Sequence, residues 1–342
     1  MDLSRYDTIR YFNDSQQFEY RLAEHLPLAP TKDRSFNQVT AYDEETREYT
    51  IAMSNYPIQG VDSIFVSLIN DYANESTPVS TNLLIAHPDA KADHPGSRSL
   101  NRILYGPKHA LFAIFDDASI YQLDTDAKQY NYIAKLFDSV DYSLIKDPVN
   151  SLAHVFDGYV LKSFIRDADA NNYLVKADFS DSTSVKVTKP VKLVSYIKGS
   201  RDEYPLNAFM IATNPTMTPQ LMVVLYGNTG GFDQFNFVDE ETGVMTPIIS
   251  NLADYNTCVF ECYSSTKDCD MWTTSAYDKA NYAVYFQCHV YDDSSEVSTT
   301  SMMKLGFTQN HVTGLWYAYV NPAESPMNFG YSGYQYVTIK QD

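Results

Sequence analysis

Oxygen-bearing side chains are closely spaced within one short stretch of the chain. The stretch reads Asp167-Ala-Asp169-Ala-Asn171-Asn172-Tyr-Leu-Val-Lys-Ala-Asp178, so carboxylate or amide oxygens fall at its positions 1, 3, 5 and 12. Calcium prefers several oxygen ligands, and a short loop with oxygens at alternate positions can wrap around one ion. We therefore predict Asp167, Asp169, Asn171 and Asp178 as calcium ligands, and calcium is the only cofactor that the sequence suggests.

This stretch resembles the EF-hand loop and also the DxDxDG turns between strands of some β-propellers. It departs from both patterns, because Asn172 replaces the glycine of the sixth position, Val175 occupies the ninth and the shorter Asp178 the twelfth. Asn tolerates the left-handed backbone, so the loop can still form. The alternative is a solvated hairpin turn between the strands YVLKSFIR and YLVKADF.

The elements that must position these residues are strands. One phrase recurs, an apolar or aromatic strand that ends at Asp or Asn and is followed by a polar turn. Its six copies are VTAYD, LFAIFD, LAHVFD, FMIATN, TTSAYD and WYAYVN, ending at Asp43, Asp116, Asp157, Asn214, Asp278 and Asn321. Every interval can hold four short strands, which is typical of propeller blades.

The sequence thus resembles six-bladed β-propellers at the level of the fold, with no specific family indicated. We predict one all-β propeller domain over residues 1–342, whose last blade joins the N-terminal strands TIRYF and FEYRLA to the C-terminal strand YQYVTIK. Such sharing removes open sheet edges. The alternative is two β-sandwich domains divided near 198–205. Asp239-Glu-Glu-Thr-Gly243 predicts a hairpin with a left-handed glycine, and TDAKQYNYIAKLFDSV is the one candidate helix.

The six strand-ending residues suggest a ring of oxygens around a central channel. Six-bladed lactonase-like and strictosidine-synthase-like propellers imply a site of this kind, in which a bound metal activates water. Asp116, followed by Asp117, is the most acidic position of the six. The alternative is that each residue only initiates a turn, because Asp and Asn side chains bond to the backbone two residues further on.

Tyrosine is unusually frequent, at 28 residues against 2 Trp. A loop tyrosine offers a flat apolar face and a hydroxyl group, which suit stacking on sugars and contacts with proteins. Tyr331, Tyr334 and Tyr336 form the densest cluster and are our predicted ligand-binding residues. The alternative for each of them is packing between blades.

Charge and cysteine content limit the partners. The net charge of -18 repels nucleic acids and anionic membranes, so neither is expected as a partner, and no apolar run suits membrane insertion. We expect a soluble protein, extracellular rather than cytoplasmic, because Cys258, Cys262, Cys269 and Cys288 cluster and two glycosylation sequons occur at Asn13 and Asn74. Local disulfides and buried thiols both remain open for these cysteines.

The common signatures of nucleotide-binding loops, metalloproteases and serine hydrolases are absent from the sequence. We therefore expect a binding or adhesion scaffold that recognises a protein or a glycan through its loop and channel faces, rather than an enzyme. The alternative is a metal-dependent hydrolase with its site in the central channel. No catalytic residue is assigned.

Overall fold

A computed structural model describes the chain in part, mainly in strands and the turns between them. The described residues are 6–12, 17–23, 38–43, 45–46, 48–58, 61–70, 80–86, 100–115, 118–136, 153–167, 171–181, 184–194, 204–226, 234–247, 249–250, 267–279, 282–292, 297–309 and 316–320. Apart from one 3-10 turn, η1 (Pro107–His109), every regular element in these ranges is a β-strand. The predicted all-β fold is confirmed.

The described strands form separate sheets in which consecutive strands pair as antiparallel neighbours. A two-stranded sheet contains β1 (Tyr6–Phe12) and β2 (Gln17–Ala23). The next contains β3 (Gln38–Asp43), β4 (Glu48–Ile58), β5 (Val61–Asn70) and β6 (Ser80–Ala86). It is followed by the sheet of β7 (Leu100–Tyr105), β8 (Leu111–Phe115), β9 (Ser119–Asp124) and β10 (Gln129–Lys135).

Three further sheets follow along the chain. One contains β11 (His154–Asp157), β12 (Val160–Arg166) and β13 (Asn172–Asp178), with β14 (Lys186–Val187) and β15 (Val191–Lys192) both on the outer side of β13. The next contains β16 (Tyr204–Ile211), β17 (Gln220–Tyr226), β18 (Gln234–Val238) and β19 (Met245–Pro247). The last contains β21 (Lys267–Asp278), β22 (Ala283–Asp292), β23 (Val297–Gln309) and β24 (Trp316–Val320), with β20 (Ile249–Ser250) added beside β24.

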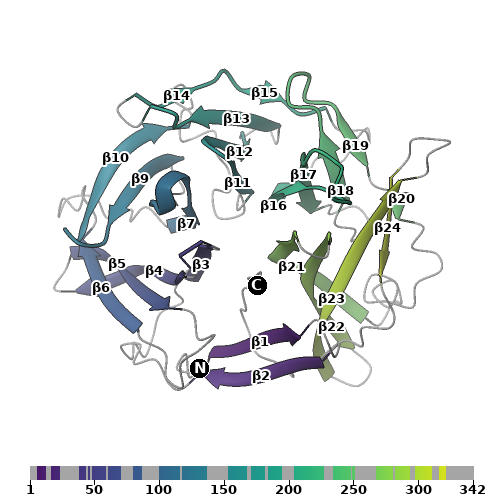
Figure 1. The fold of residues 1–342 in the computed structure, drawn as a ribbon, viewed down its shortest axis with the longest axis horizontal. Helices are drawn as coiled ribbons and strands as arrows, with labels where there is room; N and C mark the ends of the chain where they lie inside the picture. Colours follow the sequence, from purple (N-terminus) through teal and green to yellow (C-terminus); the bar gives the residue numbers. More distant parts are fainter. Residues whose placement is uncertain are drawn as a thin grey trace.

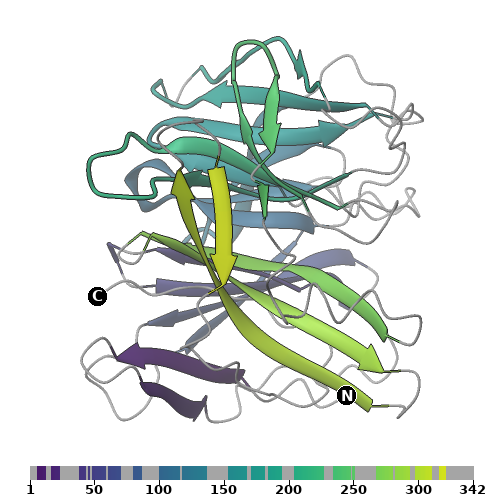
Figure 2. The same cartoon turned by 90° about the vertical axis from the view of Figure 1, so that its right-hand side faces the viewer.

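These sheets lie around a common centre in chain order (Figure 1). In each larger sheet the first full strand, namely β3, β7, β11, β16 or β21, lies toward the centre, and the β1–β2 pair lies between the β20–β24 and β3–β6 sheets. Seen from the side, the long strands of the β20–β24 sheet twist strongly (Figure 2). Separate antiparallel sheets of this kind are compatible with a propeller and with the pair of sandwiches that the sequence also allows.

The hydrophobic core is divided among the spaces between neighbouring sheets. Strand β12 explains why, because its residues Leu161–Ile165 are all buried although successive side chains point to opposite faces. Leu161 and Ile165 belong to the same apolar cluster as Phe112 and Ile114 of the β7–β10 sheet, whereas Phe164 belongs to a cluster with Leu221 and Val223 of the next sheet. A sheet covered on both faces requires apolar residues at consecutive positions, so these strands show no simple alternation.

At the outer rim, two pairs of neighbouring sheets are joined by parallel pairing of their outer segments. After β15, Val194 forms a parallel bridge to Val244, beside β19 of the next sheet, and Val194 N–H donates to Gly243 O at 2.8 Å. After β19, strand β20 pairs in parallel with β24, through Ile249 and Tyr317. In both places the chain leaving one sheet binds the outermost strand of the next sheet before it returns toward the centre.

Two expectations from the sequence need correction. Four of the recurring phrases end first strands or lie just after them, at Asp43, Asp157, Asn214 and Asp278, but LFAIFD is β8, the second strand of its sheet, and WYAYVN is β24, the fourth. Asp43 and Asn214 each accept the N–H group two residues further on, a turn contact that can follow any strand, so the phrase does not identify the strand's position within a sheet.

The segment TDAKQYNYIAKLFDSV is not a helix over its described part. It contains the turn after β9 and then β10, which pairs with β9 through Tyr130 and Leu123. The turn is stabilised by Ala127 N–H, which donates to Asp124 Oδ1 at 2.7 Å, and Lys128 has a φ of 54°. This hairpin, together with the β-forming Tyr and Ile residues, outweighs the helical spacing of the apolar side chains.

The C-terminal strand YQYVTIK, predicted to complete the last sheet, lies outside the described residues. Within the described ranges, no helix has the length and apolar character needed to cross a membrane.

Candidate functional site

The ends of the innermost strands come together on one side of the ring of sheets. His109, after β7, contacts Asp43 at the end of β3, and Phe112 of β8 packs against Phe156 near the end of β11 with ring centroids 5.5 Å apart. Ala212, after β16, donates its N–H to the Tyr277 hydroxyl of β21 at 3.1 Å. We call this side the short-turn face, because only residues 44–47, 106–110, 158–159, 212–219 and 279–282 join the first strands to the second strands there.

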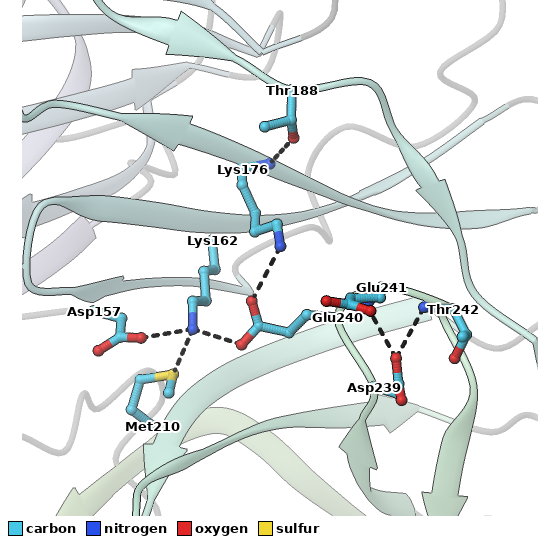
Figure 3. A network of polar contacts seen from close by, with 9 residues as sticks. All are labelled: Asp157, Lys162, Lys176, Thr188, Met210, Asp239, Glu240, Glu241 and Thr242. Carbon is cyan, nitrogen blue, oxygen red and sulfur yellow. Dashed lines mark hydrogen bonds and ion pairs between the residues drawn. The ribbon is translucent and has the colours of Figure 1, made fainter.

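A buried lysine joins two sheets at the short-turn face (Figure 3). The Lys162 side chain is only 6% exposed, yet its Nζ donates to Asp157 Oδ2 at 2.7 Å and to Glu240 Oε1 at 2.6 Å. Its third contact is Met210 Sδ at 3.5 Å. An ammonium group has three donors, so these three contacts saturate Lys162 and leave it no donor for a ligand.

Glu240 reaches Lys162 because the turn that carries it is fixed. Asp239 N–H donates to Val244 O at 2.9 Å, and Asp239 Oδ1 accepts the N–H groups of Glu241 and Thr242 (Figure 3). The backbone and side-chain bonds from Thr242 lower the pKa of Asp239. Gly243 has a φ of 71°, so the predicted hairpin over Asp239–Gly243 with a left-handed glycine is confirmed.

Asp43 is the centre of a second polar group on this face and is 7% exposed. Its Oδ2 accepts bonds from Thr46 Oγ1 and His109 Nδ1, both at 2.8 Å, and its Oδ1 accepts Glu45 N–H at 3.0 Å. Burial by itself would raise the pKa of Asp43, but the hydrogen bonds from Thr46, Glu45 and His109 together lower it. Asp43 is therefore a charged, fully bonded residue that fixes the turn after β3 against the turn after β7.

The hydroxyl group of Tyr277 links β21 to the residue that follows β16. The Tyr277 hydroxyl donates to Ala212 O and accepts Ala212 N–H, and burial is the main cause that raises the pKa of Tyr277. A raised pKa in the folded state means that the stabilisation is complete below the unfolded-state pKa of about 10 and is lost as pH rises through the folded value.

We expect Tyr277→Phe to lower the free energy of unfolding by about 1 kcal/mol at neutral pH. The difference from wild type should shrink above about pH 10, because the wild-type phenol then ionises. Urea unfolding at pH 7 and at several alkaline values measures both effects. A difference that stays constant across this range contradicts the pH-dependent part.

The opposite face of the ring is joined by longer segments. The first strands begin there, and the connections that lead into β3, β7, β11, β16 and β21 cover residues 24–37, 87–99, 136–153, 193–203 and 251–266. Every one of them is longer than any turn of the short-turn face. Connections of this length in a compact fold are usually functional or act as linkers. We call this side the long-connection face.

The predicted calcium residues lie at two different ends of β13. Asp167 and Asn171 lie in the turn between β12 and β13, on the long-connection face, where Asp167 accepts Asn171 N–H at 2.8 Å and the Tyr173 hydroxyl at 2.9 Å. Asp178 is at the far end of the strand, opposite Val160, and its Oδ1 accepts Ser180 N–H. An extended strand of this length places the two ends about 20 Å apart.

The structure therefore does not bring Asp178 to the oxygens of Asp167 and Asn171, and Asp169 lies outside the described residues. The twelve-residue spacing fails to bring position 12 back because residues 172–178 form a strand rather than the second half of a loop. Calcium binding at the β12–β13 turn stays a prediction that now depends on Asp167, Asp169 and Asn171 alone.

The proposed ring of strand-ending oxygens is only partly assembled. Asp43, Asp157 and Asp278 end first strands at the short-turn face, but Asp116 follows the second strand β8 and Asn321 follows β24, and both lie outside the described residues. Within the described ranges no group of three or more His, Cys, Asp or Glu residues could hold a metal ion. Asp43 is instead bonded to His109, and Asp157 is bonded to Lys162.

Several other predicted positions cannot be compared with the structure. Tyr331, Tyr334 and Tyr336 lie outside the described residues, as do Cys258 and Cys262. Cys269 of β21 is aligned with Val290 and Cys288 of β22 with Met271, so these two cysteines lie diagonally on adjacent strands.

Sequence reasoning missed Lys162, Glu240 and the contact of His109. A signal existed for Lys162, a charge in the interior of the mostly apolar strand YVLKSFIR, because a charge in a buried strand must have a partner. No local signal identifies Glu240 as its partner, since Glu240 lies 78 positions further along the chain. His109 reads as an ordinary loop histidine, and Asp43 is 66 positions away from it.

Comparisons with known proteins identify no family. No protein-family model matches the chain, and no curated protein matches it in sequence. Among solved structures, a triple arginine-to-alanine mutant of AofleA from Arthrobotrys oligospora aligns with 86% of this chain and 88% of its own at 9% identity, with a TM-score of 0.37. KlHsv2 with one loop replaced by a Gly-Ser linker aligns over 84% and 98% at 8% identity and a TM-score of 0.33.

The tail fiber of Staphylococcus aureus phage P68 aligns with 89% of this chain and 77% of its own, at 12% identity and a TM-score of 0.26. All of these scores are below 0.5, so none of the similarities enters the functional argument.

Proposed function

We propose that residues 1–342 form one six-bladed β-propeller that acts as a binding scaffold for a protein or a glycan. The circular order of the sheets (Figure 1) supports the propeller, as do the apolar clusters between successive sheets and the innermost strands that end on one side. The N-terminal pair β1–β2 and the C-terminal strand YQYVTIK together make the closing blade.

The difference between the two faces carries the functional proposal. On the short-turn face, Lys162 is bonded to Asp157 and Glu240, and Asp43 is bonded to His109, so these charged groups are bonded within the protein. The long-connection face carries the extended segments between blades and the Asp167 turn. Ligand-binding residues are usually placed on variable loops that a rigid scaffold supports. We therefore assign ligand recognition to the long-connection face.

Tyrosines supply the proposed contacts. Tyr142, Tyr196 and Tyr255 each belong to a long connection, and the C-terminal segment adds the cluster around Tyr334. Each offers a flat ring for stacking on a sugar or packing against a protein surface, with a hydroxyl group that can bond in the same contact. The net charge of -18 favours neutral or basic ligands over anionic ones.

A glycan array probed with the purified chain, with and without calcium, tests this function. We expect Tyr142→Ala and Tyr334→Ala to weaken binding of any recognised glycan at least about tenfold, the scale of one lost aromatic contact. Tyr159→Ala is the matched control, because Tyr159 is 48% exposed in the β11–β12 turn of the short-turn face. Equal losses for all three variants contradict the assignment of the face.

The same preparation distinguishes the alternative function. Elemental analysis that finds a tightly bound divalent ion, together with hydrolysis of ester or lactone substrates that stops on chelation, favours a metal-dependent hydrolase and counts against a pure scaffold.

A further inference from the structure

The β7–β8 turn holds His109 in an unusual backbone conformation. Lys108 has φ 58° and ψ 32°, and His109 has a φ of 59°, so two successive non-glycine residues adopt the left-handed region. Each costs free energy that the surrounding contacts must offset. The conformation brings the His109 ring to the buried carboxylate of Asp43, with Nδ1 and Oδ2 2.8 Å apart.

This contact sets the tautomer of the ring. The Asp43 carboxylate can only accept, so Nδ1 carries the proton and donates it. In the neutral ring Nε2 then has its lone pair free, and a carboxylate oxygen, Glu45 Oε2, lies 3.4 Å from it. Two electron-pair donors that face each other can share a cation, either a proton on Nε2, which makes the contact an ion pair, or a metal ion that both groups bind.

The separation fits a metal ion. Zinc binds histidine nitrogen and carboxylate oxygen at about 2.0–2.2 Å, and two such ligands at a tetrahedral angle lie about 3.4 Å apart. Metal-binding histidines almost always donate their other ring N–H to a carboxylate or carbonyl, which fixes the ring and raises its basicity. Asp43 already makes this contact with His109.

We propose that His109 Nε2 and the Glu45 carboxylate bind a divalent transition-metal ion such as Zn²⁺ on the short-turn face, with Asp43 as the positioning residue. The His109 and Glu45 side chains are 39% and 83% exposed, so the ion is accessible from solvent. Since no third such ligand completes the group within the described ranges, water or an external ligand fills the remaining coordination positions. This site is separate from the long-connection face.

Isothermal titration of the chelator-treated full chain with ZnCl₂ tests the proposal. We expect one saturable site that His109→Gln abolishes and that Glu45→Gln weakens about tenfold. Asp43→Asn should weaken binding about 10–100-fold without changing the stoichiometry, because it removes the carboxylate that orients the ring. Glu241→Gln is the matched control, an exposed glutamate in the β18–β19 turn, and should bind zinc as wild type does.

Glu45 is so exposed that Glu45→Gln should melt within a few degrees of wild type, so a folding defect cannot mimic its effect. Wild type without a saturable site overturns the proposal. Zinc binding that is unchanged in both His109→Gln and Glu45→Gln overturns it as well.

Discussion

Removing the two carboxylates around Lys162 should destabilise the protein more than removing the lysine itself. We expect the double variant Asp157→Asn/Glu240→Gln to lose about 3–5 kcal/mol of the free energy of unfolding. The reason is burial. Lys162 is 6% exposed and cannot be hydrated when its partners become neutral, whereas the Asp157 and Glu240 side chains are 49% and 27% exposed and reach water.

A third substitution should restore most of the stability that the double variant loses. Adding Lys162→Met to the double variant removes the buried charge and places an apolar chain beside Met210, so most of the lost stability should return. Lys176→Met is the control, because Lys176 contacts Glu240 at 3.4 Å from a more exposed position and should cost at most about 1 kcal/mol. Denaturant unfolding of wild type, Lys162→Met, the double variant and the triple variant measures the cycle, with Lys176→Met measured beside them. A triple variant no more stable than the double variant contradicts the explanation by burial.

Gly243→Ala should destabilise the fold far more than Gly158→Ala. Both glycines have a positive φ, 71° and 57°, so both substitutions carry the left-handed penalty of about 1–2 kcal/mol. A Cβ atom at Gly158 has nothing within 4 Å, whereas one at Gly243 would lie 2.2 Å from the backbone oxygen of Lys192. The Lys192 oxygen belongs to the backbone, so it can move away only if β15 itself moves. We therefore expect Gly243→Ala to lower the free energy of unfolding by roughly 4 kcal/mol or more in total.

Hydrogen exchange at one amide can detect the clash at Gly243 locally. Gly243 O accepts Val194 N–H at 2.8 Å, the bond that links the outer strands of two neighbouring sheets. Hydrogen exchange at the Val194 amide should therefore accelerate in Gly243→Ala and stay unchanged in Gly158→Ala. Similar free energies of unfolding for the two variants would show that the close approach of the strands does not limit this position.

Both predictions concern contacts that fasten one sheet to the next. Lys162 links the sheets near the centre at the short-turn face, and the Val194–Val244 bridge links the same two sheets at the outer rim. A face with short turns and with ion pairs such as those of Lys162 can hold the ring rigid. The long connections on the other side can then vary in sequence without disturbing the core.

The sequence alone determined the secondary structure class and much of the local turn chemistry. Abundant β-branched and aromatic residues predicted strands, and Asp239 followed by Gly243 predicted the hairpin that the structure contains. These features follow from interactions between residues a few positions apart, such as the Asp239 carboxylate and the Thr242 amide. Local chemistry of this kind is the same in any fold that contains the turn.

Only the tertiary structure decided which strands are equivalent and which polar residues meet. The strand LFAIFD has the same local pattern as HVFD, yet it is the second strand of its sheet and HVFD is the first, because position in a sheet depends on pairing with the previous strand. The same holds for Lys162 with Glu240 and for Asp43 with His109, which are brought together across the seams between sheets. Side chains distant in sequence meet only when whole sheets pack, and no short segment encodes that packing.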